Sequence, residues 1–243
     1  MKKMNNNLRF GSTKALLAKG FTLVELLVVI AIIAVLAGLA TPQIMKAKKN
    51  ADRTTAINNA RQIGMALLEF ENEYSTFPSE ETRRDLEDLD IETVPDGDDA
   101  NAYLGQLISA DFIDSEEVFY AKGVKGARKG DNIMSQGEIL TEGENAWGYV
   151  MLSDGAALSS SSASSVTPVL VAPLTRGGSE PEFDPVPYNG KMVYFKPDGS
   201  TAEARVKKNG QAALTKGRTL FAVGEGTIWE RDEPDVREPT GLN

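Results

Sequence analysis

An apolar stretch of 20 residues near the N-terminus constrains this chain more than any other feature. From Phe21 to Ala40 every residue is apolar or small except Thr22 and Glu25. As an α-helix, such a stretch is about 30 Å long, which is the thickness of the hydrocarbon core of a bilayer. It therefore predicts a membrane-spanning helix, and the rest of the 243-residue chain has room for one sizeable domain.

Charge is distributed unevenly along the chain. Residues 1–20 contain five basic and no acidic residues, whereas the remainder contains 21 basic and 35 acidic residues, a net charge of −14. An acidic body disfavours nucleic acid as the main partner, because phosphate binding needs a basic surface. The chain also has no histidine and no cysteine, so it lacks imidazole bases, thiolates and the commonest zinc ligands. We therefore do not expect an enzyme.

A basic N-terminus followed by an apolar stretch is also typical of a secretory signal peptide, which would be cleaved here after Ala40. Three features disfavour that alternative. The apolar stretch is longer than the usual length of about 7–15 residues. It contains a glutamate near its start, and its helical pattern continues beyond Ala40.

Glu25 needs an explanation of its own. An ionised carboxylate inside a bilayer costs about 2.5–3.5 kcal/mol unless it is paired, and residues 21–40 contain no lysine or arginine. Cleavage after Gly20 would give Phe21 a free α-amino group, and that amine on a neighbouring copy could neutralise Glu25. The alternative, which needs no cleavage, places Glu25 at the level of the lipid headgroups.

The sequence from Gly20 to Glu25, GFTLVE, resembles the processing signal of type IV prepilins and of the pseudopilins of type II secretion. The resemblance covers residues 19–42, about a tenth of the chain. It implies that prepilin peptidase removes the basic leader, residues 1–20, by cutting after Gly20. It also implies that Phe21 becomes an N-methylated N-terminus and that Glu25 pairs with the Phe21 amine of an adjacent subunit during assembly.

The helix is expected to cover residues 21–75, with a membrane-spanning first half and an amphipathic second half. Pro42 matches a position at which helices of this family often kink, since proline lacks an N–H and clashes with the preceding turn. Further on, apolar residues at helical spacing form one stripe that we expect to pack on a sheet: Ala56, Ala60, Ile63, Leu67, Phe70 and Tyr74.

The charges that flank the apolar stretch give little information on its orientation. Lys46, Lys48, Lys49 and Arg53 follow the stretch, so basic residues are nearly as dense there as in the leader. The positive-inside rule therefore favours a cytoplasmic leader only weakly. The family resemblance implies a single-pass protein of the bacterial inner membrane, with its leader in the cytoplasm and its head on the other side.

Residues 76–243 are expected to form a globular α+β head with an antiparallel sheet, which together with the helix gives a pilin-like fold. Alternation and turn residues predict a strand at 147–152, a short edge strand at 169–172 and a hairpin of 192–195 with 201–206. We also expect a final hairpin of 220–223 with 227–229, a flexible serine loop at 159–165, a solvated loop at 121–145 and a loosely held tail at 230–243.

Residues 79–100 are acidic and are expected to be irregular, with a turn at 95–99. Carboxylates at this density are compatible with calcium, which some heads of the family bind. The spacing does not match an EF-hand-type loop, however, and the family's site lies nearer the C-terminus. We expect instead that an aspartate caps a helix at roughly 101–113, and we expect no cofactor.

The resemblance implies a structural filament subunit, namely a pseudopilin of a type II secretion system. Its partners would be other copies, related pseudopilins, prepilin peptidase and the inner-membrane assembly platform. A type IV pilus subunit for adhesion, motility or DNA uptake shares every N-terminal feature, but the cysteine pair common in major pilins is missing here. A membrane-tethered enzyme or binding module is a third alternative, which the lack of histidine, cysteine and catalytic spacing disfavours.

Overall fold

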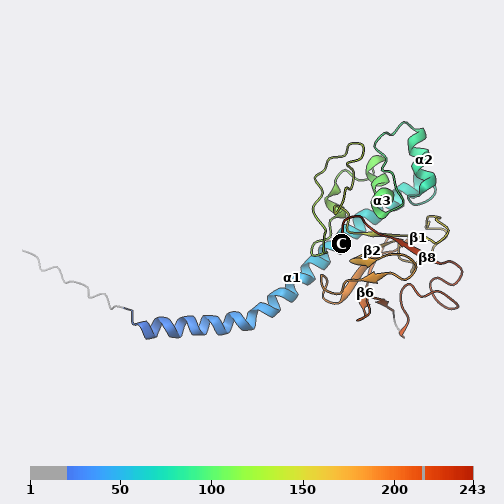
Figure 1. Ribbon diagram of the computed structural model, residues 1–243. Helices are drawn as coiled ribbons and strands as arrows, with labels where there is room; N and C mark the ends of the chain where they lie inside the picture. The colour runs from blue at the N-terminus through green and yellow to red at the C-terminus, as the bar shows by residue number, and fades with distance from the viewer. Residues whose placement is uncertain (1–20, 215–216, 243) are drawn as a thin grey trace, which may run out of the picture. The chain divides into compact units, whose positions relative to one another are not determined.

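A computed structural model describes residues 21–214 and 217–242 of the chain (Figure 1). The chain divides into two compact units, residues 1–44 and residues 45–243, and the helix α1 (Leu23–Tyr74) contributes to both. We call the second unit the head unit. The leader predicted over residues 1–20 lies outside the described residues.

In the first unit, α1 exposes its apolar side chains. The large apolar residues from Phe21 to Ile44 are 46–78% exposed. Among the described residues, α1 is the one helix that is long and apolar enough to cross a membrane. The helix continues through Pro42, which has no N–H for the carbonyl of Gly38. The predicted kink at Pro42 stays a prediction.

In the head unit, α1 buries one face against the sheet, and this confirms the predicted α+β fold class. The predicted stripe is buried from Ala56 to Phe70, and these members belong to the hydrophobic core. Gly64 lies on the same face, where a Cβ atom would lie only 2.2 Å from the ring of Phe195. A glycine therefore allows the helix to lie directly against the ring of Phe195 in the sheet.

The main sheet has six antiparallel strands in the order β7-β6-β5-β2-β1-β8. They are β1 (Gly148–Leu152), β2 (Leu170–Ala172), β5 (Lys191–Phe195), β6 (Thr201–Val206), β7 (Ala212–Ala213) and β8 (Pro234–Arg237). A separate pair consists of β3 (Leu174–Arg176) and β4 (Glu182–Phe183). The predicted strand at 147–152 and the predicted hairpin, now β5 and β6, are confirmed.

Three predictions about the strands are wrong. The strand at 169–172 is not at an edge, because β2 lies between β5 and β1 and its flanking prolines fall outside it. The tail is not loosely held, because β8 pairs along most of β1 and buries Val236. The hairpin at 220–229 is also absent, since only a single parallel bridge joins Val223 to Trp229 there.

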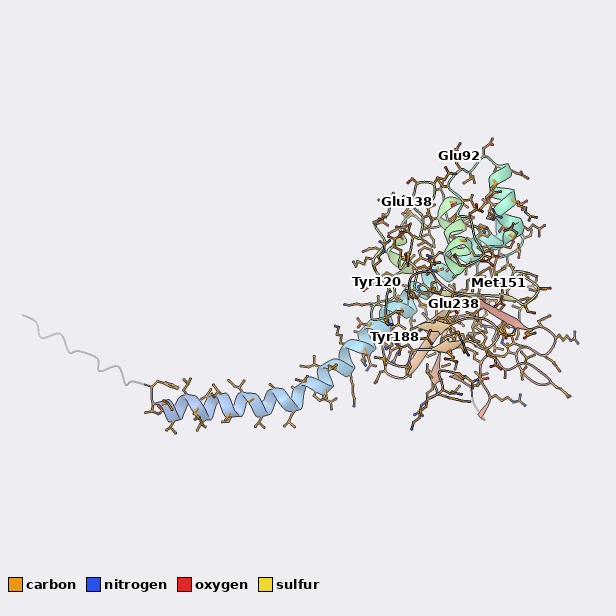
Figure 2. The ribbon with its side chains drawn as sticks, in the orientation of Figure 1. Glu92, Tyr120, Glu138, Met151, Tyr188 and Glu238 are labelled. Carbon is orange, nitrogen blue, oxygen red and sulfur yellow. The ribbon has the colours of Figure 1, made fainter. Side chains whose placement is uncertain are left out.

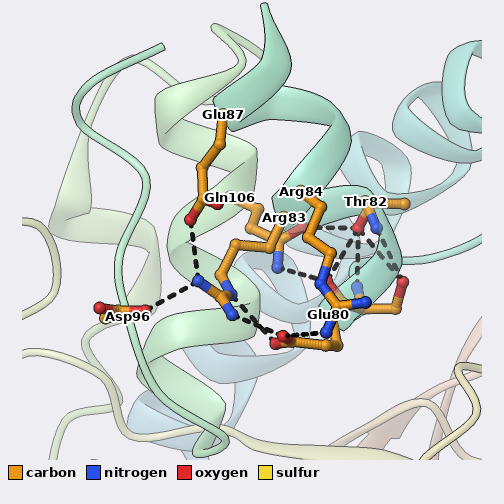
Figure 3. A network of polar contacts seen from close by, with 8 residues as sticks. Glu80, Thr82, Arg83, Arg84, Glu87, Asp96 and Gln106 are labelled. Atoms are coloured by element: carbon orange, nitrogen blue, oxygen red, sulfur yellow. Dashed lines mark hydrogen bonds and ion pairs between the residues drawn. The ribbon is translucent and has the colours of Figure 1, made fainter. Parts of the chain in front are cut away.

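The segment at 79–100, which we expected to be irregular, contains the helix α2 (Glu80–Asp88). Ser79 and Thr82 form a capping box at its start. We did not predict it, because the acidic composition of the segment suggested an irregular structure. Arg83 then binds Glu80, Glu87 and Asp96 at 2.6–2.8 Å (Figure 3). Composition alone is therefore misleading in this segment, since part of the negative charge is compensated by Arg83.

The predicted aspartate cap is confirmed. Asp99 accepts a hydrogen bond from the N–H of Ala102 at 2.9 Å at the start of α3 (Ala100–Ser109). The helix ends four residues before the predicted end, and Phe112 lies beyond it, with its ring 5.4 Å from that of Phe70. Figure 1 shows α2 and α3 on one side of the head unit and β6 on the other.

Replacing Asp99 by alanine should lower the free energy of unfolding of the head by about 1 kcal/mol, the usual effect of losing an N-cap. Asp99→Asn keeps the acceptor oxygen and should retain most of the stability. Urea unfolding of the purified chain, followed by tryptophan fluorescence, measures both. Equal losses for the two variants would show that the charge of Asp99, and not its capping bond, is what matters.

Candidate functional site

Thr22 and Glu25 form a reciprocal pair at the start of α1. The backbone N–H and the hydroxyl of Thr22 donate to Oε2 of Glu25 at 2.9 and 2.7 Å. In return, the N–H of Glu25 donates to the Thr22 hydroxyl oxygen at 3.2 Å. This arrangement is a capping box, in which two residues three apart satisfy each other's N–H groups. It was not predicted, although Thr-x-x-Glu before an apolar stretch is its signature.

The capping box provides part of the explanation that Glu25 needs. Even in a single chain, Oε2 accepts two hydrogen bonds, and these offset part of the cost of a carboxylate in an apolar environment. Within the described residues no hydrogen bond reaches Oε1, and Glu25 is exposed. The local pair thus fixes the side chain and leaves one oxygen for a donor from outside the chain.

The other residues predicted for this site lie as follows. Gly20 falls outside the described residues, so cleavage after it stays a prediction. Phe21 is described and is 73% exposed, one residue before the capping box. Its N-methylation and the pairing of its amine with Glu25 of another copy also stay predictions.

In the head unit, two buried carboxylates hold the loop that precedes β1. Glu116, at the start of the 3₁₀ helix η1 (Glu116–Phe119), accepts the N–H groups of Leu140 and Asn132, each at 2.8 Å. Glu144 accepts Arg128 Nη1 at 2.7 Å and the N–H of Thr141 at 2.8 Å. Residues 121–145, which we expected to form a solvated loop, are therefore held by hydrogen bonds to these two buried carboxylates.

These two glutamates and Asp131 also form a group whose carboxylate oxygens lie within 4.8 Å of one another. Such a group could hold a metal ion by distance alone. However, backbone N–H groups bind Glu116, and N–H groups and an arginine bind Glu144, so loop support already explains why they lie together. The expectation that the head has no cofactor, with calcium as the alternative, stays a prediction.

Glu116 should make the stability of the head depend on pH. Burial raises the pKa of its carboxyl, and the N–H groups of Leu140 and Asn132 oppose this only in part. Because its pKa is raised on folding, Glu116 holds its proton more tightly in the folded protein than in the unfolded chain. The contribution of Glu116 to stability therefore falls as the pH rises from about 4.5 through the folded-state pKa. The wild type should therefore lose stability relative to Glu116→Gln as the pH rises above about 4.5. Urea titrations at several pH values measure this, and a constant difference would contradict it.

Two comparisons show what this chain is similar to. Residues 17–41 match the family model described as the prokaryotic N-terminal methylation motif. Over 63 residues the chain is 40% identical to the type II secretion system core protein G of Pectobacterium carotovorum subsp. carotovorum. The matched region is 26% of this chain and 40% of that relative, so the chain spans about two fifths of the relative's length. No solved structure matches the chain.

These matches confirm the predicted resemblance to type IV pilin-like proteins and to the pseudopilins of type II secretion. They support a structural, pilin-like role. Together with the long apolar helix, the motif fits a protein that crosses the inner membrane once.

Proposed function

We propose that this chain is a filament subunit of a type II secretion system. In this proposal, prepilin peptidase removes residues 1–20 at the cytoplasmic side of the inner membrane, Phe21 is methylated, and the subunit joins a filament through its exposed apolar helix. The filament then helps to move folded proteins outward. The match of residues 17–41 to the methylation motif supports the processing and filament steps, and the 40% identity over 63 residues to a type II secretion system core protein G favours secretion over a pilus.

The geometry at Glu25 supports the assembly step. The capping box holds the carboxylate near Phe21, at the end of the helix where the new amine would form, and Oε1 has no donor among the described residues. An ammonium group of an adjacent subunit would supply that donor and neutralise the charge. Because the carboxylate and the ammonium group meet in an apolar medium, the electrostatic attraction between them is stronger than it would be in water.

Genetics tests which kind of filament the chain joins. Deleting the gene should abolish the release of secreted enzymes into the medium while leaving surface pili and twitching motility unchanged, and a plasmid copy should restore secretion. Loss of twitching with normal secretion would instead identify a type IV pilus subunit and contradict the proposal. Loss of neither would exclude both roles for this chain under the conditions used.

A further inference from the structure

Six basic residues lie on or beside the first turns of α1 in the head unit, and we call them the basic collar: Lys46, Lys48, Lys49, Arg53, Lys122 and Lys191. Ion pairs tie the head residues to the helix. Lys122 Nζ lies 3.6 Å from Oδ1 of Asp52. Arg53 lies 2.7 Å from Glu203, to which Lys191 also binds.

Two backbone carbonyls of the head also meet α1 beside the collar. Arg53 donates to the carbonyl of Tyr188 at 3.4 Å, and Asn59 donates to that of Tyr120 at 3.0 Å. Figure 2 shows both tyrosines beside α1 and Glu92 at the upper edge of the head unit. The collar thus lies at the start of the part of α1 that belongs to the head unit.

The collar carries more positive charge than its own contacts use. In the described part of the chain, two carboxylates pair with residues of the basic collar, namely Asp52 and Glu203. The collar therefore has six cations for two anions, although the net charge of the whole chain is −9. Among the described residues, no ion pair reaches Lys46, Lys48 or Lys49, and the first two are exposed. Three cations are therefore available to a ligand from outside the chain.

The position of these lysines in the chain points to the ligand. Lys46 comes six residues after Ala40, where the apolar stretch ends, which is about 9 Å along a helix. The headgroup layer is roughly 5–8 Å thick on each side of the hydrocarbon core, and a lysine side chain reaches several ångströms toward the interface. If residues 21–40 fill the hydrocarbon core, Lys46, Lys48 and Lys49 lie within reach of the lipid phosphates.

We propose that the basic collar binds the anionic headgroups of phospholipids through Lys46, Lys48 and Lys49, and so holds the head against the membrane before assembly. This inference rests on the membrane insertion in the proposed function. The acidic surface of a second copy is the other ligand with suitable charge. Lipid is favoured because the short distance from the apolar stretch keeps the lysines within reach of the headgroups in every inserted chain, whether or not a second copy is present.

Hydrogen exchange of the full chain in lipid nanodiscs, at one chain per disc, tests the proposal. The discs contain phosphatidylcholine alone or mixed with phosphatidylglycerol. Each lysine near an anionic surface raises the binding constant about fivefold. The amides of residues 45–52 should therefore exchange at least about ten times more slowly in the anionic discs. The difference should disappear at about 1 M salt, where the screening length falls to roughly 3 Å.

A triple variant and a matched control complete the test. Lys46→Gln/Lys48→Gln/Lys49→Gln should lose the lipid effect. Arg61→Gln/Arg84→Gln/Lys129→Gln removes the same charge elsewhere and should keep it. Equal exchange in the two lipids, or an effect that survives the lysine triple variant, would overturn the proposal. So would an effect seen only in discs with two or more chains, because the ligand would then be a second copy.

The same data separate this inference from the proposed function. If residues 23–40 exchange freely in both kinds of disc, the chain does not insert, and the proposed membrane role is wrong. If those residues are protected and residues 45–52 show no dependence on lipid charge, only the proposal for the basic collar fails. Exchange in β5 serves as an internal measure that the head remains folded in every variant.

Discussion

Glu25→Ala should leave cleavage after Gly20 intact and abolish filament assembly. In the proposed assembly step, the carboxylate of each added subunit keeps its capping box and forms an ion pair with the new N-terminal amine of its neighbour. Breaking a buried ion pair by removing one partner costs about 3–5 kcal/mol, which is at least about a hundredfold in association at every subunit contact. Filaments sheared from cells and quantified by immunoblotting, beside the processed subunit in the membrane, measure both outcomes.

Two further variants separate the two roles that the structure gives to this side chain. Glu25→Gln keeps an oxygen for the capping box, since glutamine serves there as well as glutamate, but it removes the charge. Thr22→Val removes the hydroxyl of the capping box and keeps the charge. Assembly should fail in Glu25→Gln and persist, at a reduced level, in Thr22→Val. The reverse pattern would mean that helix capping is the contribution of Glu25 and that no ion pair is involved.

Gly64→Leu should have the largest effect on the folding of the head. Even the first carbon of a side chain at this position would lie 2.2 Å from the ring of Phe195, which is fully buried in β5. For Gly64→Ala, overpacking of about 1–3 kcal/mol outweighs the helix preference of alanine over glycine, about 1 kcal/mol. For leucine no rearrangement of one ring provides enough room, so the helix must separate from the sheet. Thermal unfolding and protease resistance of the head measure the loss.

A double-mutant cycle makes the cause of that loss specific. Phe195→Leu creates space opposite Gly64, and it should destabilise the wild-type chain through the cavity it leaves. Combined with Gly64→Ala, it should cost less than the sum of the two single changes, because the two residues contact each other. Additive losses would show that the helix and the strand are not in contact at this point.

Some parts of this fold could be predicted from the sequence because their signals are local. The apolar stretch, the stripe from Ala56 to Phe70 and the alternating hairpin of β5 and β6 each depend on a period within a few turns or residues. The aspartate cap of α3 could be predicted for the same reason. The capping boxes that begin at Thr22 and Ser79 are equally local and were not predicted, because the charge of Glu25 and the acidic composition after Ser79 masked their spacing.

Other parts could not be predicted because they depend on contacts between distant segments. The strand β8 has a proline and charged residues, and only its pairing with β1 makes it a strand. Nothing near Gly64 in the sequence indicates that Phe195 lies over it. The burial of Glu116 and Glu144 depends on backbone N–H groups supplied by residues up to 24 positions away. Sequence patterns describe single elements, whereas these features arise when elements meet.

The mass of the mature N-terminal peptide tests most directly the claim that this chain is a processed filament subunit. The subunit should be isolated from membranes of cells that contain prepilin peptidase, digested and analysed by mass spectrometry, with a peptidase-deficient strain as control. We expect a peptide that begins at Phe21 and carries one N-terminal methyl group, and a chain that retains residues 1–20 in the control. A leader retained in both strains, or a chain that begins after Ala40, would contradict the claim.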